Sequence, residues 1–285
     1  MSVSVVTDGT AEGLLTVVYK YYYEKLRPLD VIDGSSPAFQ QAFGVDYLFV
    51  ETDREMAEKV YGAMEKKLRA ETLQNFQRAN LSGTGDKHFD LFRYVLLAFK
   101  EPDRVDSMAR MDFVMSVQKL AQNVGREAHK LTGFLRFRQT SQGILYADVS
   151  PKNNVLAILC AHFMDRLGGE AFVIHDLDRG LAGVYHGEEC VIVEIPKDLK
   201  PIFDDDGQEG IWQELWAIFY NTIGIQERKN SRLRTQLNPK YFWKHQTEHQ
   251  IEYKKALRPR PARAKEIGRE IRPAEAINEI KQIED

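Results

Sequence analysis

The clearest pattern of apolar and polar positions lies between Asp112 and Val149. Apolar residues recur there at steps of three and four, a spacing that lays one apolar stripe along a helix. The stripe consists of Phe113, Val117, Leu120, Val124, Ala128 and Leu131. Gly133 is expected to end this helix, because glycine commonly follows the last helical turn.

From Phe134 onward the period of the pattern changes to two, which is the period of a strand. Over Phe134–Gln139 the alternation directs Leu135 and Phe137 toward a core, and Arg136 and Arg138 toward the opposite face. Ser141-Gln142-Gly143 then predicts a turn, and Ile144–Val149 predicts a returning strand. A long helix that leads into a hairpin is therefore expected at the centre of the fold.

The chain after the hairpin predicts one buried helix and three strands. The helix is expected over Pro151–Leu167, opened by proline in its first turn and ended by Gly168-Gly169. The strands are expected at Ala171–Asp176, Leu181–His186 and Cys190–Ile195. Because tight turns join antiparallel neighbours, we expect an α+β fold with a mainly antiparallel sheet (two strands, buried helix, three strands) covered by helices.

The N-terminal part of the chain predicts strands that alternate with helices. Val3–Thr7 and Tyr47–Glu51 have strand patterns, and Pro28–Ala38 between them is expected to be a loop. Thr10 and Asp53 are placed to cap helices over Ala11–Leu26 and Arg54–Arg69. The first of these helices is expected to bury Leu14, Leu15, Val18, Tyr22 and Leu26. Further helices are expected at Glu71–Asn80 and His88–Lys100, joined by a Ser82-Gly83-Thr84-Gly85 loop that lacks the spacing of a phosphate-binding loop.

The predicted organisation is one large α+β domain over residues 1–250, followed by a basic, proline-containing tail over residues 251–285. Within the domain we expect an N-terminal α/β part (1–105), a central sheet part (106–200) and a basic, helical C-terminal part (208–250). An amphipathic helix is expected at Ile211–Ile223, and a short helix at Ala274–Ile283 in the tail.

Composition narrows the class of protein. The 285 residues are 43% hydrophobic and 28% charged, as in a folded domain. Cys160 and Cys190 lie in apolar segments, which indicates two buried free thiols and no disulfide framework or Cys-based zinc site. No apolar run reaches the roughly 18 residues of a membrane span, so we expect a cytoplasmic protein without membrane contact.

The net charge of −3 conceals a basic segment, because Lys and Arg outnumber Asp and Glu from Arg228 to Arg272. Cations that neutralise phosphates and aromatic rings that stack on unpaired bases together favour nucleic-acid binding. The candidate residues are Arg228, Lys229, Arg232, Arg234, Lys240, Tyr241, Trp243 and Lys244. Phe242 lies between Tyr241 and Trp243. The alternative is a solvated basic face whose aromatic residues anchor the segment to the core.

Arg136 and Arg138 are further candidates for nucleic-acid contact, because a basic and aromatic sheet face can bind a strand. The alternative is a face of ion pairs, with Asp148 and Glu194 as partners.

An enzyme would use other residues, and the candidates are His129, His175 and Asp176. Imidazole and carboxylate groups can hold a divalent metal ion that activates water. His175 and Asp176 should point to opposite faces of one strand, so we expect no metal site there and no cofactor.

Five stretches resemble one family, the bacterial "probable DNA metabolism protein" family. They are DGTAEGLLTVVY, VQKLAQNVGREAHKLTGFLRF, YADVSPKNNVLAILCAHFMDRL, FVIHDLDRGLAGVY and ERKNSRLRTQLNPKYFWKHQTE. The resemblance spans Val3 to Glu248, and Ser231 and Leu237 depart from it where a proline and a methionine are expected. It implies a context of DNA repair or modification, since genes of that family commonly lie beside a radical-SAM repair protein and related domains occur fused to uracil-DNA-glycosylase-like domains.

The function expected from the sequence is therefore a DNA-binding accessory protein that acts with a radical-SAM partner. One alternative is a protein–protein scaffold that uses Trp212 and Trp216, or Ile277 and Ile280, as its contact surface. The other is a nucleic-acid-processing enzyme that uses the His129, His175 and Asp176 region.

Overall fold

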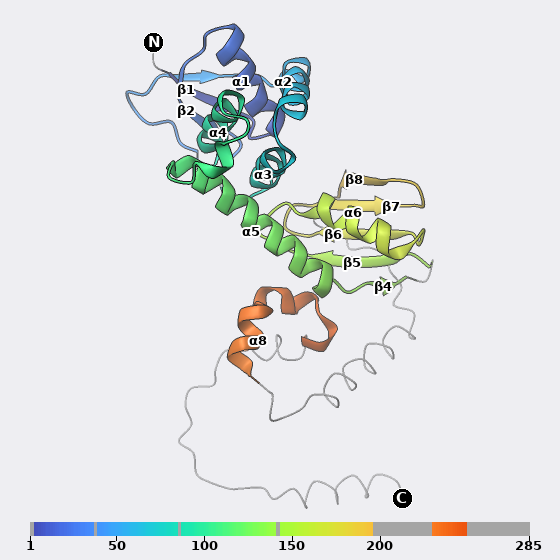
Figure 1. Cartoon of the computed structure of the whole chain (residues 1–285). Coiled ribbons are helices and arrows are strands. Elements are labelled where there is room, and N and C mark those ends of the chain that lie inside the picture. The colour runs from blue at the N-terminus through green and yellow to red at the C-terminus, as the bar shows by residue number, and fades with distance from the viewer. Residues whose placement is uncertain (1–2, 37–38, 85–86, 141–142, 196–229, 250–285) are drawn as a thin grey trace, which may run out of the picture.

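The computed structural model describes residues 3–36, 39–84, 87–140, 143–195 and 230–249 (Figure 1). The predicted α+β class is confirmed: one sheet has three parallel strands, and the other has five strands in a mixed arrangement. In the described part of the chain, no helix is long and apolar enough to cross a membrane.

The first sheet has the order β2-β1-β3, with β1 (Val3–Thr7) between β2 (Pro28–Asp33) and β3 (Tyr47–Phe49). The prediction of a loop at Pro28–Ala38 is wrong for β2, which pairs in parallel with β1 and buries Val31. A proline is compatible with the first position of a strand, so it marked the start of an element and not a loop.

Four helices contribute buried residues to the same core as this sheet. They are α1 (Ala11–Tyr23), α2 (Arg54–Lys67), α3 (Ala70–Asn80) and α4 (His88–Lys100). The predicted caps are confirmed, because Thr10 accepts from the Gly13 N–H and Asp53 accepts from the Met56 N–H. One prediction for α1 is wrong: Tyr22 lies in the last turn with 49% of its surface exposed, and is not part of the buried stripe.

The long helix α5 (Asp112–Phe134) connects two hydrophobic cores (Figure 1). Val114, Val117 and Ala121 belong to the core around the first sheet, whereas Val124, Ala128 and Leu131 belong to the core of the second. Gly133 does not end the helix, which continues through Phe134 and stops where Leu135 becomes extended. A short 3₁₀ helix, η1 (Val105–Ser107), precedes α5.

The second sheet has the order β4-β5-β6-β7-β8. Its elements are β4 (Arg138–Gln139), β5 (Leu145–Val149), α6 (Leu156–Leu167), β6 (Phe172–Asp176), β7 (Leu181–Tyr185) and β8 (Cys190–Glu194). The predicted order of two strands, a helix and three strands is confirmed. The sheet is mainly antiparallel as predicted, since β4–β5, β6–β7 and β7–β8 are antiparallel pairs, but β5 and β6 run parallel. The helix between them returns the chain to the end of the sheet where β5 began, and a parallel pair requires such a crossover.

Helix α6 covers one face of this sheet, where Leu156, Leu159 and Phe163 enter the second core (Figure 1). Pro151 does not open α6 as predicted, since the helix begins at Leu156 and residues 151–155 form a loop. Gly168 ends the helix with a left-handed φ of 58°, as expected. Cys160 is buried, and Cys190 is half-buried rather than fully buried.

The described C-terminal segment consists of α8 (Ser231–Leu237), η3 (Lys240–His245) and η4 (Thr247–His249). Phe242 anchors it by packing into the second core. The predictions made for residues 196–229 and 250–285 lie outside the described residues.

Candidate nucleic-acid interface

The aromatic cluster of the predicted basic segment lies against the protein core. Trp243 is only 4% exposed, and its indole N–H donates to the Asn238 carbonyl at 3.1 Å. His249 stacks on its ring at a centroid distance of 4.8 Å, and the Arg234 guanidinium lies 4.9 Å from the ring centroid. Base stacking requires an open ring face, so Trp243 and the buried Phe242 fit the alternative of an anchored segment.

The cations of this segment differ in accessibility. Arg232 and Lys240 are exposed, Lys244 is half-buried, and Lys240 Nζ lies 5.8 Å from the centroid of Trp243. Arg228 and Lys229 lie outside the described residues. Arg232 and Lys240 are therefore the members of the predicted set that are best placed to meet a phosphate.

Arg136 and Arg138 both form ion pairs, as in the alternative to nucleic-acid contact, although Arg136 pairs with Glu248 and not with the expected Glu194. Arg136 Nη2 lies 2.7 Å from Glu248 Oε1, whose side chain is 5% exposed. Arg138 Nη2 lies 3.5 Å from Asp148 Oδ1, and His245 Nδ1 lies 3.1 Å from Asp148 Oδ2. Burial alone would raise the pKa of Asp148, but the adjacent His245 and Arg138 hold it below its usual value.

The structure does not bring the three candidate catalytic residues into one constellation. His129 is exposed on α5, whereas His175 is buried in β6 with Nδ1 2.9 Å from the Tyr146 hydroxyl. Asp176 is paired with Arg179, whose guanidinium lies 2.8 Å from its Oδ2. Burial lowers the pKa of His175, against the opposing effect of Asp148 and Asp176. Among the described residues, no group of three or more His, Cys, Asp and Glu side chains could hold a metal ion.

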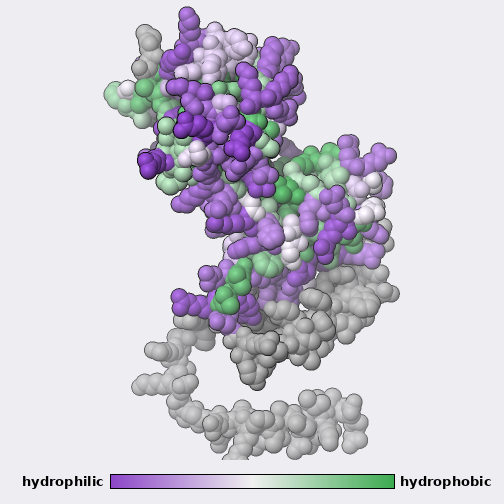
Figure 2. All heavy atoms as spheres, in the orientation of Figure 1, coloured by the Kyte–Doolittle hydropathy of each residue, from purple (hydrophilic) through white to green (hydrophobic). Residues whose placement is uncertain are grey.

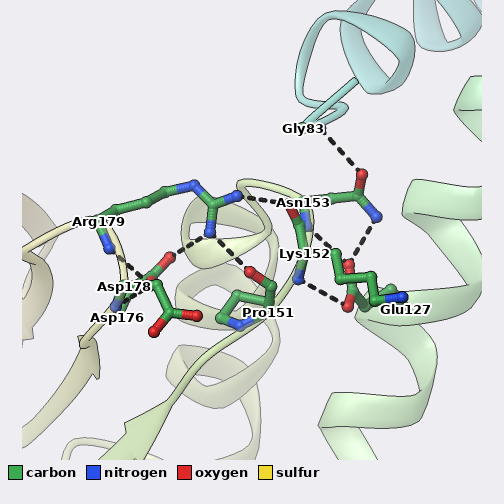
Figure 3. A network of polar contacts seen from close by, with 8 residues as sticks. All are labelled: Gly83, Glu127, Pro151, Lys152, Asn153, Asp176, Asp178 and Arg179. Atoms are coloured by element: carbon green, nitrogen blue, oxygen red, sulfur yellow. Dashed lines mark hydrogen bonds and ion pairs between the residues drawn. The ribbon is translucent and has the colours of Figure 1, made fainter. Parts of the chain in front are cut away.

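The buried carboxylate of Glu127, on α5, organises a polar junction between distant segments (Figure 3). Its Oε1 accepts from the Lys152 N–H at 3.0 Å and from the Tyr241 hydroxyl at 3.2 Å. Its Oε2 accepts from the backbone and side-chain N–H groups of Asn153 at 2.9 and 2.6 Å. The two carboxylate oxygens thus fix the loop after β5 against α5.

Arg179, in the turn between β6 and β7, holds the same loop from the other side (Figure 3). Its guanidinium donates to the carbonyls of Pro151 and Lys152 at 2.9 and 2.7 Å, and to Asp176 at 2.8 Å. The N–H groups of residues 152 and 153 therefore bind Glu127, while the carbonyls of residues 151 and 152 bind Arg179. These bonds, and not a helix start, account for the conformation after Pro151.

The loop between α3 and α4 joins this junction through Gly83. The Gly83 N–H donates to Asn153 Oδ1 at 3.1 Å. A Cβ at Gly83 would lie 2.3 Å from the Lys152 carbonyl oxygen, so only glycine fits this approach. The Gly83/Gly85 pair lacked a phosphate-loop spacing, yet its first glycine packs directly against the candidate site.

Glu127 also lines a cleft of about 420 Å³. Three cationic side chains line it: Arg126 and Lys130 from α5, and Lys152 from the loop after β5. Arg126 and Lys152 are exposed, and Lys152 Nζ lies 5.3 Å from the centroid of the Tyr241 ring. We call this site the basic cleft. Burial, together with the nearby Glu127 carboxylate, raises the pKa of Tyr241, which therefore stays a neutral donor.

The basic cleft was not among the sites predicted from the sequence. Arg126 and Lys130 are four residues apart, a spacing that places them on one helix face and could have indicated a basic edge. Lys152 reaches the same cleft only because of the conformation of the loop after β5, which no local sequence pattern predicts.

The fold and the cleft define an α+β protein with a cation-lined depression where two hydrophobic cores meet. The chain belongs to the family described as DUF4130, a domain of unknown function, whose model matches residues 86–248. No curated protein matches the chain. The matched region contains all three cations of the basic cleft together with Glu127 and Tyr241.

Proposed function

We propose that this protein is a DNA-binding accessory factor in DNA repair or modification, and that a radical-SAM partner supplies the chemistry. The basic cleft is the observation that carries the DNA-binding part of the proposal. The resemblance to the "probable DNA metabolism protein" family supports the repair context and the choice of partner.

The charge balance of the cleft supports an anionic ligand. Glu127 is the one carboxylate among the described residues that line it, and four hydrogen-bond donors already surround that carboxylate. Arg126, Lys130 and Lys152 therefore present a net positive surface, with neighbouring backbone held rigidly by Glu127 and Arg179. Phosphates suit such a surface, because their neutralisation releases bound counterions.

The test is a fluorescence-anisotropy titration of the full chain with single-stranded, duplex and uracil-containing DNA at about 50 and 200 mM salt. We expect binding that weakens as salt rises, with a log–log slope of about −2 if three single-strand phosphates are neutralised. The variant Arg126→Ala/Lys130→Ala/Lys152→Ala should bind roughly tenfold more weakly or worse at low salt.

The matched control is Arg104→Ala/Arg110→Ala/Lys119→Ala, which removes three exposed cations that do not line the cleft. It should retain wild-type affinity. Equal losses of DNA affinity in the two variants would show that binding depends only on the net charge of the protein and not on the basic cleft. An absence of DNA binding by the wild-type protein at low salt would refute the proposal.

A protein–protein scaffold is the second candidate, favoured by the exposed apolar surface of β8. Val191, Ile192 and Val193 are 48%, 45% and 38% exposed, and hydrophobic residues lie at the surface in this region (Figure 2). An apolar strand at a sheet edge is suited to pairing with another chain. A partner complex that survives high salt and is lost in Val191→Lys/Val193→Lys would support this function.

A further inference from the structure

A second aromatic and basic surface lies at the C-terminal end of α1, among the helices that enclose the first core. The run Tyr19-Lys20-Tyr21-Tyr22-Tyr23 ends this helix, and a groove of about 940 Å³ lies between it, α2 and α4. Four tyrosines line the groove: Tyr19, Tyr21, Tyr22 and Tyr23. We call it the tyrosine groove.

The outer rings of the tyrosine groove are open to solvent. Tyr23 is 73% exposed and Tyr22 is 49% exposed, although large aromatic side chains usually contribute to the core. They are also held in place, because Tyr23 stacks on Tyr19 at a centroid distance of 4.4 Å and Tyr22 packs edge-on against Phe99 at 6.0 Å. A contiguous exposed aromatic patch on a rigid helix end indicates a binding surface.

The charged side chains that line the groove are all cationic. Lys59 and Lys67 come from α2, and Arg93 and Lys100 come from α4. Lys59, Lys67 and Lys100 are exposed, whereas Arg93 is half-buried over the Phe113 ring at 4.8 Å and is paired with Asp90. No Asp or Glu lines the groove among the described residues, so its charge complements an anion.

We propose that the tyrosine groove binds unpaired nucleotides of single-stranded DNA, with Tyr22 and Tyr23 stacking on bases and Lys59, Lys67 and Lys100 neutralising phosphates. Exposed aromatic faces interleaved with cations are the combination by which proteins hold single strands without reading their sequence. A duplex hides its base faces, so the groove discriminates between the two forms of DNA. The inference rests on the proposed function and names the form of DNA that is bound, but it uses none of the residues of the basic cleft.

The test compares the affinities of the full chain for an oligothymidylate and for a duplex of equal length. In Tyr22→Ala/Tyr23→Ala we expect the single-strand affinity to fall roughly tenfold or more, because each base stack contributes about 1–3 kcal/mol. Duplex affinity should be unchanged. The matched control Tyr22→Phe/Tyr23→Phe retains the rings and should bind like wild type. If the alanine variant does not fold, Lys59→Ala/Lys67→Ala tests the phosphate contacts of the groove instead and should lower single-strand affinity.

The outcomes separate this inference from the proposed function. If oligothymidylate binding is unchanged in the tyrosine and lysine variants but lost in the basic-cleft variant, the tyrosine groove is overturned and DNA binding stands. If the phenylalanine control loses as much affinity as the alanine variant, stacking is overturned. Competition by polyglutamate as effective as by oligothymidylate would identify an acidic protein segment as the occupant and would overturn the inference. A wild-type protein that binds no DNA overturns both.

Discussion

The Glu127 junction gives the sharpest test of the structure, because one buried side chain receives four hydrogen bonds from three residues. Glu127→Ala leaves two backbone N–H groups, the Asn153 amide and the Tyr241 hydroxyl without their acceptor. A hydrogen bond to a charged group contributes about 1.5–3 kcal/mol, and water entering from the basic cleft replaces part of that. We therefore expect the free energy of unfolding to fall by about 4 kcal/mol.

A double-mutant cycle isolates one of these bonds. Tyr241→Phe removes only the long, 3.2 Å bond to Glu127, so it should cost about 1.5 kcal/mol, the lower end of that range, in urea unfolding of the otherwise wild-type protein. In the Glu127→Ala background the same substitution should cost almost nothing, because its acceptor is already absent. Equal costs in the two backgrounds would mean that the hydroxyl and the carboxylate do not interact, and the account of the junction would be wrong.

Two further predictions concern buried positions. Burial lowers the pKa of Lys87 to about 8, and the positive charge of Arg179 adds to this effect while Asp33 opposes it. Since the unfolded lysine has a pKa near 10.4, the unfolded chain binds more protons between these values. Between pH 7.5 and 10 the free energy of unfolding of the wild-type protein should therefore rise by about 2 kcal/mol more than that of Lys87→Met. Unfolding free energies of the two proteins that change in parallel with pH would contradict this prediction. In β7, a Cβ at Gly183 would lie 2.1 Å from Cys160 Sγ, so Gly183→Ala should lower the urea midpoint by an amount equivalent to about 1–3 kcal/mol. Adding Cys160→Ala should restore part of that loss, and no restoration would place the strain elsewhere.

Local signals predicted much of the fold. The side chains of Thr10 and Asp53 identified two helix starts, because capping depends on residues three positions apart. The order of elements around α6 also followed from periodicity. The parallel pairing of β5 with β6 did not, since strand direction depends on where the intervening helix packs.

The candidate sites were less predictable for a related reason. Composition drew attention to Trp243, whose ring is enclosed by His249 and Arg234, and away from Tyr23, which is exposed. A run of aromatic and basic residues has the same composition whether its rings face solvent or the core. Only tertiary packing decides between the two. Packing also places Lys152, which lies in the loop between β5 and α6, at the same cleft as Arg126.

Helix α5 contributes residues to both cores, but the family model matches only part of the first core. The family match begins at residue 86, after α1, α2 and α3, yet α4 and the first half of α5 pack in the same core as those helices. A fragment cut at that boundary would keep one complete core and expose the apolar side of another, including Val95, Val114 and Val117. A protein that contains only the matched region therefore has to cover this side with a segment of its own or with a second protein. The region that the family model matches is therefore shorter than the region that the two cores enclose.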